Sequence, residues 1–131
     1  MTDIPGTVSL GVDIIEIPRI ERALSRWGER FLRHLYTPTE VQLCHGKAQA
    51  FAVRFAAKEA VMKALGTGAR GVGWREIEIL ADKLGKPTVR LHGRAEARAR
   101  ELGITAIAAS LSHAREYAVA FVVATIYNLN E

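Results

Sequence analysis

The chain has 131 residues, a formal net charge of +4 and an isoelectric point near 9.6. A chain of this length can bury a real core, and we expect a single domain over residues 1–131. The positive charge favours an acidic partner, but nucleic acid, an acidic protein and a phosphorylated small molecule would all be attracted by it. Charge that only keeps the protein soluble is an equally good interpretation. Composition therefore excludes little by itself.

The cysteine content and the apolar stretches limit where the protein works. Cys44 is the only cysteine in the sequence, which excludes an intrachain disulfide and a metal site built from several thiolates. Residues 1–6 lack the basic start and the apolar stretch of a signal peptide. The longest apolar stretch, residues 117–126, is too short to cross a bilayer as a helix. We therefore expect a cytoplasmic protein that does not bind membranes.

The first predicted elements are a strand and a helix that follow one another almost directly. Apolar residues alternate with small or polar ones over residues 7–16, which is the pattern of a half-buried strand. One face carries Val8, Leu10, Val12 and Ile14, and the other carries Ser9, Gly11 and Asp13. Pro18 suits the first turn of a helix, whose apolar positions are Ile17, Ile20, Leu24 and Trp27. The basic face of this helix carries Arg19, Arg22 and Arg26.

Two more helices are predicted in the middle of the chain. Thr37, Pro38 and Glu40 supply an N-cap, a proline for the first turn and the glutamate of a capping box, so a short helix begins there. A longer helix is expected over about residues 49–65. It ends near Gly66, because glycine can adopt the positive φ that closes a helix.

The second half of the sequence is richer in strands. Residues 74–80 alternate in polarity, and a glycine-containing turn leads from them into residues 88–91, which predicts a hairpin. A helix is expected over residues 94–102, followed by strands at 105–112 and 117–126. This order of elements favours an α+β domain with helices packed on a mainly antiparallel sheet.

The longer predicted helix carries few charged residues on an otherwise apolar surface. Arg54 and Lys58 lie one turn apart on one line, and Glu59 and Lys63 lie one turn apart on another. Charges on a buried helix are costly unless they are paired, bind a metal or meet a ligand. Glu59 and Lys63 form an ordinary i, i+4 pair in the simplest interpretation. The alternative is a metal site, because Asp13 could reach Glu59 and two adjacent carboxylates need a cation between them.

Mg²⁺ is the ion that suits such a carboxylate pair. It keeps several waters and bridges one or two carboxylates to a substrate phosphate, which nearby lysines and arginines would also hold. The sequence has no phosphate-cradling GxxxxGK[ST] loop, which argues against a kinase. A nucleic-acid-binding module is another alternative, motivated by Arg94, Arg98 and Arg100. Such a module needs no carboxylate pair and the aromatic residues are few and scattered, so we expect no nucleic-acid partner.

Four segments of the sequence resemble the motifs of holo-acyl-carrier-protein synthases, which are 4′-phosphopantetheinyl transferases. The first is GVDIIEIPR at 11–19, and the second is RFAAKEA at 54–60 with KA at 63–64. GKP at 85–87 and SLSH at 110–113 resemble the two later motifs. Each motif is weak alone, but the four occur in order over most of the chain. The resemblance implies the α+β fold of this family and the transfer of 4′-phosphopantetheine from coenzyme A to a serine of apo acyl carrier protein, with release of 3′,5′-ADP.

The resemblance also implies roles for individual residues. Asp13 and Glu59 correspond to the family's metal ligands, which makes Mg²⁺ the expected cofactor, and Lys63 joins them as a catalytic residue. The residues expected to contact coenzyme A are Arg54, Lys63, Gly66, Pro87 and His113. A lone histidine after a strand is more often structural, but the resemblance favours the nucleotide contact for His113.

The partners implied by the resemblance are an acyl carrier protein and further copies of the chain. Carrier proteins are acidic, and Arg19 matches a family arginine that meets the carrier; extending this docking role to Arg22 and Arg26 rests on helical geometry. A solvated face is the usual meaning of such a run. The family forms homotrimers with active sites at subunit interfaces. The chain has Ala114 where many members have a polar residue, so the general base stays open between Glu59 and a metal-bound water.

Overall fold

The computed structural model describes residues 7–127. Its larger sheet has three antiparallel strands in the order β1-β5-β4. Their bounds are Thr7–Glu16 for β1, Ile104–His113 for β4 and Tyr117–Ile126 for β5. The smaller sheet is an antiparallel hairpin of β2 (Ile77–Ala81) and β3 (Pro87–Leu91), and β3 contacts β4. The predicted α+β architecture with a mainly antiparallel sheet is therefore confirmed.

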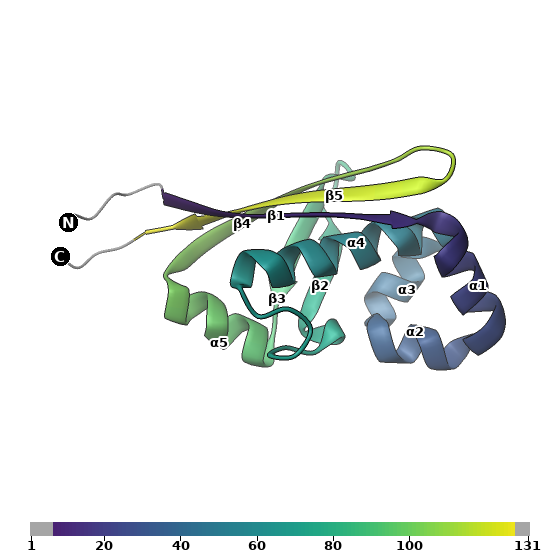
Figure 1. Cartoon of the computed structure of the whole chain (residues 1–131), viewed down its shortest axis with the longest axis horizontal. Coiled ribbons are helices and arrows are strands. Elements are labelled where there is room, and N and C mark those ends of the chain that lie inside the picture. The colour runs from purple at the N-terminus through teal and green to yellow at the C-terminus, as the bar shows by residue number, and fades with distance from the viewer. Residues whose placement is uncertain (1–6, 128–131) are drawn as a thin grey trace.

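The helices lie against one face of the larger sheet and around its ends (Figure 1). Their bounds are Ile17–Trp27 for α1, Glu29–Leu35 for α2, Pro38–Cys44 for α3, Ala48–Leu65 for α4, Trp74–Glu76 for the 3-10 helix η1 and Gly93–Leu102 for α5. α4 runs along β1 and β5, with α1 to α3 at one end of the molecule and α5 at the other (Figure 1). α4 is thus the element that connects the sheet to the remaining helices.

The helix boundaries follow the local sequence signals. The capping box of α3 is formed as predicted, because the Glu40 backbone N–H donates to Thr37 Oγ1 at 3.2 Å and the Thr37 N–H donates to Glu40 Oε1 at 2.9 Å. Gly66 closes α4 with a φ of 72°. Gly28, with a φ of 52°, separates α1 from α2. The helix α2 was not among the predicted elements.

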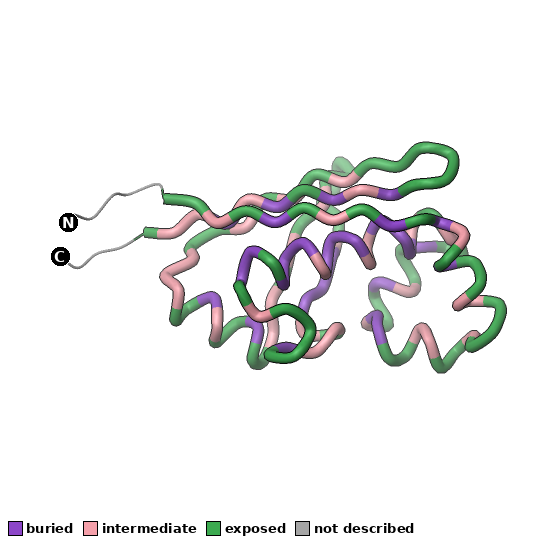
Figure 2. Tube along the Cα trace, in the orientation of Figure 1, coloured by how far each residue is buried: buried purple, intermediate pink, exposed green. Residues whose placement is uncertain are grey.

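β1 is the strand whose burial departs from its sequence pattern. The face that α4 covers includes Gly11 and Ile15, which are buried. The opposite face is uncovered and carries Val8, Leu10, Val12 and Ile14, at 46%, 54%, 53% and 62% exposure. α4 comes so close to β1 that a Cβ atom at Gly11 would lie 1.8 Å from the Ala60 carbonyl oxygen. The strand is half-buried as predicted (Figure 2), but the face that carries Gly11 is inside, because a side chain at Gly11 would collide with the backbone of α4.

α1 contains one further correction. Ile17 and Ile20 are buried as the apolar spacing predicts. Trp27, which was expected to complete this buried face, is 48% exposed. The guanidinium groups of Arg26 and Arg30 lie 5.0 and 5.9 Å from the centre of its ring, so the indole packs against cations rather than in the core.

Candidate active site

The two charged lines of α4 face different elements. On one line, Arg54 Nε donates to the Ile79 carbonyl at 3.1 Å, and Lys58 Nζ donates to Glu40 Oε1 at 2.8 Å, so this line faces β2 and α3. On the other line, the Lys63 ammonium bonds to β1. Both lines were predicted from the sequence. The prediction did not include the different surroundings of the two polar clusters that they form.

The line that faces β1 contains the two carboxylates proposed as metal ligands. Asp13 projects from the helix-covered face of β1, and its Oδ1 accepts a hydrogen bond from Lys63 Nζ at 3.0 Å. Lys63 Nζ also donates to the Val12 carbonyl at 2.9 Å. The Asp13 side chain is only 15% exposed, whereas that of Lys63 is 55% exposed, so the lysine closes the cluster on its solvent side.

The second oxygen of Asp13 has an unusual environment. Asp13 Oδ2 is buried, and no hydrogen-bond donor within residues 7–127 reaches it. Burial first, and then the hydrogen bond and repulsion between its carboxyl group and that of Asp13, raise the pKa of Glu59 to about 7. The charges of Lys63 and Arg19 oppose this rise. Two interacting carboxylates cannot both be ionised without compensation, which a shared proton or a nearby cation supplies.

This donor set fits a magnesium ion. Carboxylate oxygens are the ligands that Mg²⁺ prefers, and one or two carboxylates are enough when waters and substrate phosphates fill the other positions. The buried, unpartnered Asp13 Oδ2 is the kind of atom that such an ion would satisfy. Within the described residues no group of three or more His, Cys, Asp or Glu side chains converges on one point, which is unlike a closed structural metal site.

The residues predicted to contact coenzyme A are not brought together within one chain. Gly66 immediately follows the Glu59 and Lys63 line of α4. Arg54 is on the other line, where its guanidinium also donates to the Ala50 carbonyl at 3.4 Å. Pro87 lies at the start of β3, on the far side of β4 from β1. The predicted contacts therefore divide between the carboxylate side and the β3–β4 side.

A groove lies next to Pro87. It has a volume of about 380 Å³, and its walls include Lys86, Pro87, Ser110 and Phe121. Phe121 is paired with Val12 in the β1–β5 register, so its side chain is on the uncovered face of the sheet. The groove thus opens on the face opposite to the one from which Asp13 projects.

His113 is the last residue of β4 and is exposed. It pairs with Ala118 of β5, which in turn pairs with Ile15 of β1. Two strand spacings, about 10 Å, therefore separate the backbone of His113 from that of Ile15. Asp13 is two residues further along β1, so His113 of the same chain is remote from the carboxylate pair.

The predicted docking residues are all on the molecular surface. Arg19, Arg22 and Arg26 are exposed on α1, as the helical spacing predicted. Arg19 is in the first turn of α1, which directly follows β1 and its Asp13, and its charge lowers the pKa of Glu59. Arg26 also lies over the Trp27 ring. The basic face of α1 therefore begins beside the candidate metal site and leads away from it.

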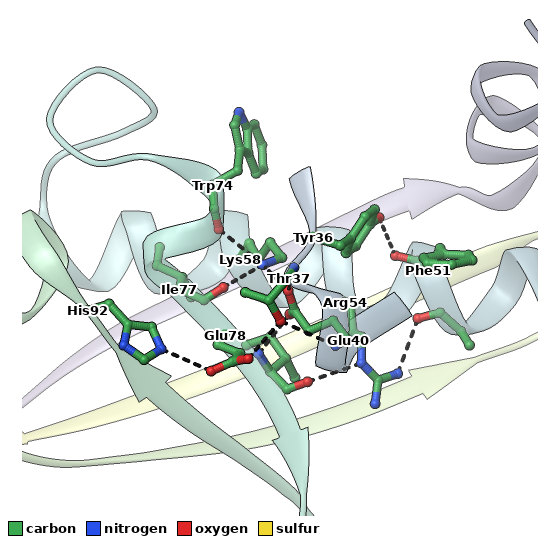
Figure 3. Close-up of polar contacts among 12 residues, drawn as sticks. Tyr36, Thr37, Glu40, Phe51, Arg54, Lys58, Trp74, Ile77, Glu78 and His92 are labelled. Atoms are coloured by element: carbon green, nitrogen blue, oxygen red, sulfur yellow. Dashed lines mark hydrogen bonds and ion pairs between the residues drawn. The ribbon is translucent and has the colours of Figure 1, made fainter. Parts of the chain in front are cut away.

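A buried polar cluster was not predicted as such (Figure 3). Lys58 and Glu40 form an ion pair with both side chains 0% exposed, and Glu40 Oε2 accepts a hydrogen bond from the Ile79 N–H at 2.8 Å. Glu78 Oε2 accepts from Thr37 Oγ1 at 2.6 Å nearby. Glu40 was recognised only as a capping-box residue. Lys58 was the one indication of this cluster in the sequence, because a lysine on an otherwise apolar part of α4 needs a buried partner.

Comparison with known proteins agrees with this combination of fold and site. The profile of the 4′-phosphopantetheinyl transferase superfamily matches residues 9–122. A holo-[acyl-carrier-protein] synthase from Herpetosiphon aurantiacus is 53% identical over 120 residues, which are 86% of this chain and 94% of that protein. One from Koribacter versatilis is 49% identical over 117 residues, covering 86% and 94%.

Solved structures give the same result. Helicobacter pylori holo-[acyl-carrier-protein] synthase in complex with coenzyme A superposes with a TM-score of 0.82 at 32% identity, covering 88% of this chain and 99% of the other. The Plasmodium yoelii acyl carrier protein synthase with ADP bound has a TM-score of 0.84 at 31% identity, with coverage of 98% and 100%. An α+β enzyme of the phosphopantetheinyl transferase superfamily is thus the class defined by fold and site. The chain belongs to the holo-[acyl-carrier-protein] synthase family.

Proposed function

We propose that this protein transfers the 4′-phosphopantetheine group of coenzyme A to a serine of apo acyl carrier protein in a Mg²⁺-dependent reaction. The serine oxygen forms a bond to the phosphorus that carries the pantetheine arm, and the bond from that phosphorus to the bridging oxygen of the pyrophosphate breaks. The products are holo acyl carrier protein and 3′,5′-ADP. Relatives named holo-[acyl-carrier-protein] synthase, and related structures with coenzyme A or ADP bound, support this proposal.

The observation that carries the proposal is the buried Asp13 Oδ2 next to a Glu59 whose pKa is raised. We assign Asp13 and Glu59 as the ligands of Mg²⁺. When bound, the ion would offset negative charge on the phosphate oxygens. Asp13 and Glu59 would hold the ion, and Lys63, whose side chain is 55% exposed, bonds to Asp13 on the solvent side of the cluster. The serine proton requires an acceptor, and Glu59 is the candidate among these side chains.

Lys63 is assigned a direct contact with the phosphate. Its ammonium group has three N–H donors, and the contacts with Asp13 and Val12 occupy two of them. The remaining donor and the 55% exposure of the side chain leave it accessible to a substrate oxygen. A positive charge fixed in this place stabilises the charge that builds up on the transferred and leaving oxygens.

The other proposed contacts with coenzyme A are Arg54, Gly66, Pro87 and His113. Because the groove at Pro87 and the carboxylate pair are on opposite faces of the sheet, we propose that a complete site uses residues from two copies of the chain. The uncovered face of β1 supports this, because Val8, Leu10, Val12 and Ile14 form an apolar surface that a monomer would leave in water. We propose a homotrimer with active sites at its subunit interfaces.

The carrier protein is proposed to dock on the basic face of α1. Arg19, Arg22 and Arg26 are exposed, and Arg19 is close enough to influence the pKa of Glu59. A carrier held by an acidic helix on this face would have its serine near the carboxylate pair. Contacts of this type act mainly on the rate of encounter.

We also propose that residues 1–131 form one phosphopantetheinyl transferase domain and that the enzyme is cytoplasmic. The profile match over residues 9–122 supports the single domain. Cys44 is a buried free thiol, which is typical of a reducing compartment. Within the described residues no helix is both long and apolar enough to span a membrane.

The direct test is mass spectrometry of an apo acyl carrier protein incubated with the enzyme, coenzyme A and Mg²⁺. We expect the carrier to gain the mass of one phosphopantetheinyl group and an equal amount of 3′,5′-ADP to be released. A carrier whose acceptor serine is replaced by alanine, and a reaction with a chelator, are the controls. Transfer that continues after complete removal of divalent cations would refute the metal assignment.

Sharing of the site between copies has a separate test. Asp13→Ala and His113→Ala chains would each be inactive, but subunits of the two variants should recover activity when they are unfolded together and refolded as mixed oligomers. The recovered sites would combine an intact Asp13 from one chain with an intact His113 from another. No recovery in mixed oligomers would show that both residues act within one chain.

A further inference from the structure

We propose that the buried ion pair of Lys58 and Glu40 consists of positioning residues, which fix the rotation of α4 about its axis and so keep Glu59 and Lys63 directed at Asp13. This inference rests on the proposed function, because only a shared metal site requires Glu59 and Asp13 to be held close together. It concerns the cluster on the opposite line of α4, which touches none of the proposed substrate contacts other than Arg54 (Figure 3).

The Lys58 ammonium is fully used by the protein. It donates to Glu40 Oε1 at 2.8 Å, to the Trp74 carbonyl at 3.0 Å and to the Ile77 carbonyl. These acceptors belong to α3, η1 and β2, so one atom of α4 is held from three directions. An ammonium group has three donors, and hence none remains for a substrate. Lys58 is therefore excluded as a catalytic residue.

Glu40 extends this connection to the backbone at the start of α3 and to that of β2. Its Oε1 also accepts the hydrogen bond from the Thr37 N–H, and its Oε2 accepts one from the Ile79 N–H at 2.8 Å. Arg54, one turn before Lys58, donates to the Ile79 carbonyl at 3.1 Å. α4 is thus connected to β2 by hydrogen bonds with defined directions on this side.

The sheet side of α4 has fewer buried hydrogen bonds to fix this rotation: Ser9 Oγ donates to the Ala64 carbonyl at 2.7 Å, and the bonds of Lys63 to β1 come from an exposed side chain. Ala56, Ala60 and Ala64 form the line nearest β1, where Gly11 lies directly against Ala60. Such small side chains allow close approach but form shallow ridges that interlock weakly, and van der Waals packing has little directional preference. We infer that the polar side of the helix sets its angle, while the alanine side sets its distance from the sheet.

The angle matters because Lys58 and Glu59 are consecutive residues, about 100° apart around the helix. A side-chain tip lies about 6 Å from a helix axis, so a turn of 20° would move the Glu59 carboxyl group by about 2 Å. A displacement of 1 Å can reduce a rate about 100-fold.

A buried ion pair is also not the most stabilising choice, since well-packed apolar residues are often as good. A positioning role explains why such a pair is present.

The test separates stability from geometry with three variants. Glu40→Gln and Lys58→Gln each leave a buried charge unpaired, and each should lower Tm by more than about 10 °C. The double variant Glu40→Gln/Lys58→Gln is uncharged and retains donors and acceptors, so it should recover much of the Tm. We expect its kcat to remain at least about tenfold below that of the parent, with KM for the carrier unchanged.

A readout that does not depend on transfer is the affinity for Mn²⁺, followed by the paramagnetic resonance of the free ion. The double variant should bind Mn²⁺ at least about tenfold more weakly, because Glu59 is no longer held near Asp13. Leu102→Ala is the control: Leu102 is on α5 and packs partly buried against the core, so its truncation should lower Tm without changing Mn²⁺ affinity or kcat well below Tm.

The outcomes are distinct. A double variant with restored Tm, parental kcat and parental Mn²⁺ affinity would overturn the positioning role and leave a purely structural pair. If the unaltered protein neither binds Mn²⁺ nor transfers phosphopantetheine, the proposed function itself has failed. Should the double variant not fold, Glu40→Asp keeps the charge and shortens its reach by one methylene. Reduced kcat and Mn²⁺ affinity in Glu40→Asp would support the proposal, and parental values would overturn it.

Discussion

The two charged lines of α4 each carry a lysine that pairs with a carboxylate of another element, but the hydrogen-bonding groups around them are satisfied to different degrees. On the β2 side, Lys58 has a protein acceptor for each of its three donors, and it is 0% exposed together with Glu40. On the β1 side, Asp13 has a buried oxygen without a donor in the described part of the chain, and the pKa of Glu59 is raised. One helix thus carries a polar cluster that is complete and another that is not.

This difference separates a structural role from a functional one. A buried cluster in which every donor and acceptor is paired holds elements together and gains nothing from an added ligand. A cluster with an unpaired oxygen and repelling carboxylates is destabilised until a cation arrives. The comparison teaches that incomplete satisfaction, more than the presence of charge, distinguishes the proposed metal site from the structural cluster. Changing residues on each side should therefore have different consequences.

The largest effect is expected from removing a carboxylate of the incomplete cluster. Asp13→Ala and Glu59→Ala should each reduce transfer by about 1,000-fold, because each removes a proposed ligand of the ion that would offset phosphate charge. Neither should lower the Tm of the metal-free protein, since each relieves repulsion between two carboxylates. Initial rates of carrier modification and thermal melts with and without Mg²⁺ would check both expectations.

Glu96→Ala removes an exposed carboxylate on α5 and is the matched control, expected to leave the rate unchanged. The parent protein should gain Tm when Mg²⁺ is added, and the two variants should not. A variant at Asp13 or Glu59 that retains near-normal rates at limiting Mg²⁺ would show that the ion is held elsewhere.

Lys63 provides the next largest effect. Lys63→Met should lower kcat/KM by an amount equivalent to about 2 to 4 kcal/mol, because a fixed positive charge near the developing oxyanion is lost. Its side chain is 55% exposed, so Tm should fall much less than after a change of the buried Lys58 five residues earlier. Steady-state kinetics with both substrates would measure this. An unchanged kcat/KM would remove Lys63 from the phosphate site.

Much of the fold could be predicted from local signals. The capping box of α3, the closing Gly66 of α4 and the strand at residues 117–126 each depend on neighbours in the sequence, and each was found. The burial of β1 could not be predicted in this way, because its apolar face is exposed in the single chain. Which face of a strand is covered depends on the helix that packs on it, and Gly11 shows its importance only beside Ala60.

The candidate site was also predicted only in part, because some of its contacts join segments that are far apart in the sequence. Glu59 and Lys63 were identified by spacing on one helix, and the structure brings Asp13 to them from β1. The partnership of Lys58 with Glu40 depends on residues 18 positions apart, and no local pattern reports it. His113 and Pro87 were predicted from the family resemblance, and their separation from Asp13 in a single chain became apparent only from the strand order.

A smaller effect is expected from Arg19, which borders the incomplete cluster. Arg19→Glu should raise KM for the carrier about tenfold, and KM for coenzyme A much less, because it reverses one charge on the proposed docking face. The salt dependence should become shallower, since the Debye length shrinks from about 10 Å at 0.1 M salt to about 3 Å at 1 M. Kinetics at several salt concentrations would measure both changes.

Arg19 also separates docking from catalysis. An effect confined to KM for coenzyme A would place Arg19 in the nucleotide site, next to the Glu59 whose pKa it lowers. Arg33→Glu, an exposed position on α2, is the matched charge reversal. An equal effect of both variants would mean that the overall charge of the protein, rather than the face of α1, attracts the carrier.

The smallest effect is expected from Glu78, next to the complete cluster. Burial raises the pKa of Glu78, but hydrogen bonds with Thr37 and His92 outweigh it and hold the pKa below its ordinary value of 4.5. A carboxylate with a depressed pKa adds stability above pH 4.5 and loses it as the pH falls through the pKa of the folded state. Glu78→Gln should therefore cost about 1 kcal/mol at pH 7 and much less near pH 3.

Thermal melts of Glu78→Gln and of the parent at the two pH values would measure this difference. Transfer at pH 7 should be unchanged. The hydrogen bonds that Glu78 would lose are to Thr37 and His92, which are not on α4, and the bonds of Lys58 stay in place. A Tm difference that is the same at both pH values would mean that the charge of Glu78 contributes nothing to stability. A loss of transfer without a loss of Tm would mean that the positioning of α4 extends beyond Lys58 and Glu40 to Glu78, whose bonds to Thr37 and His92 do not touch α4.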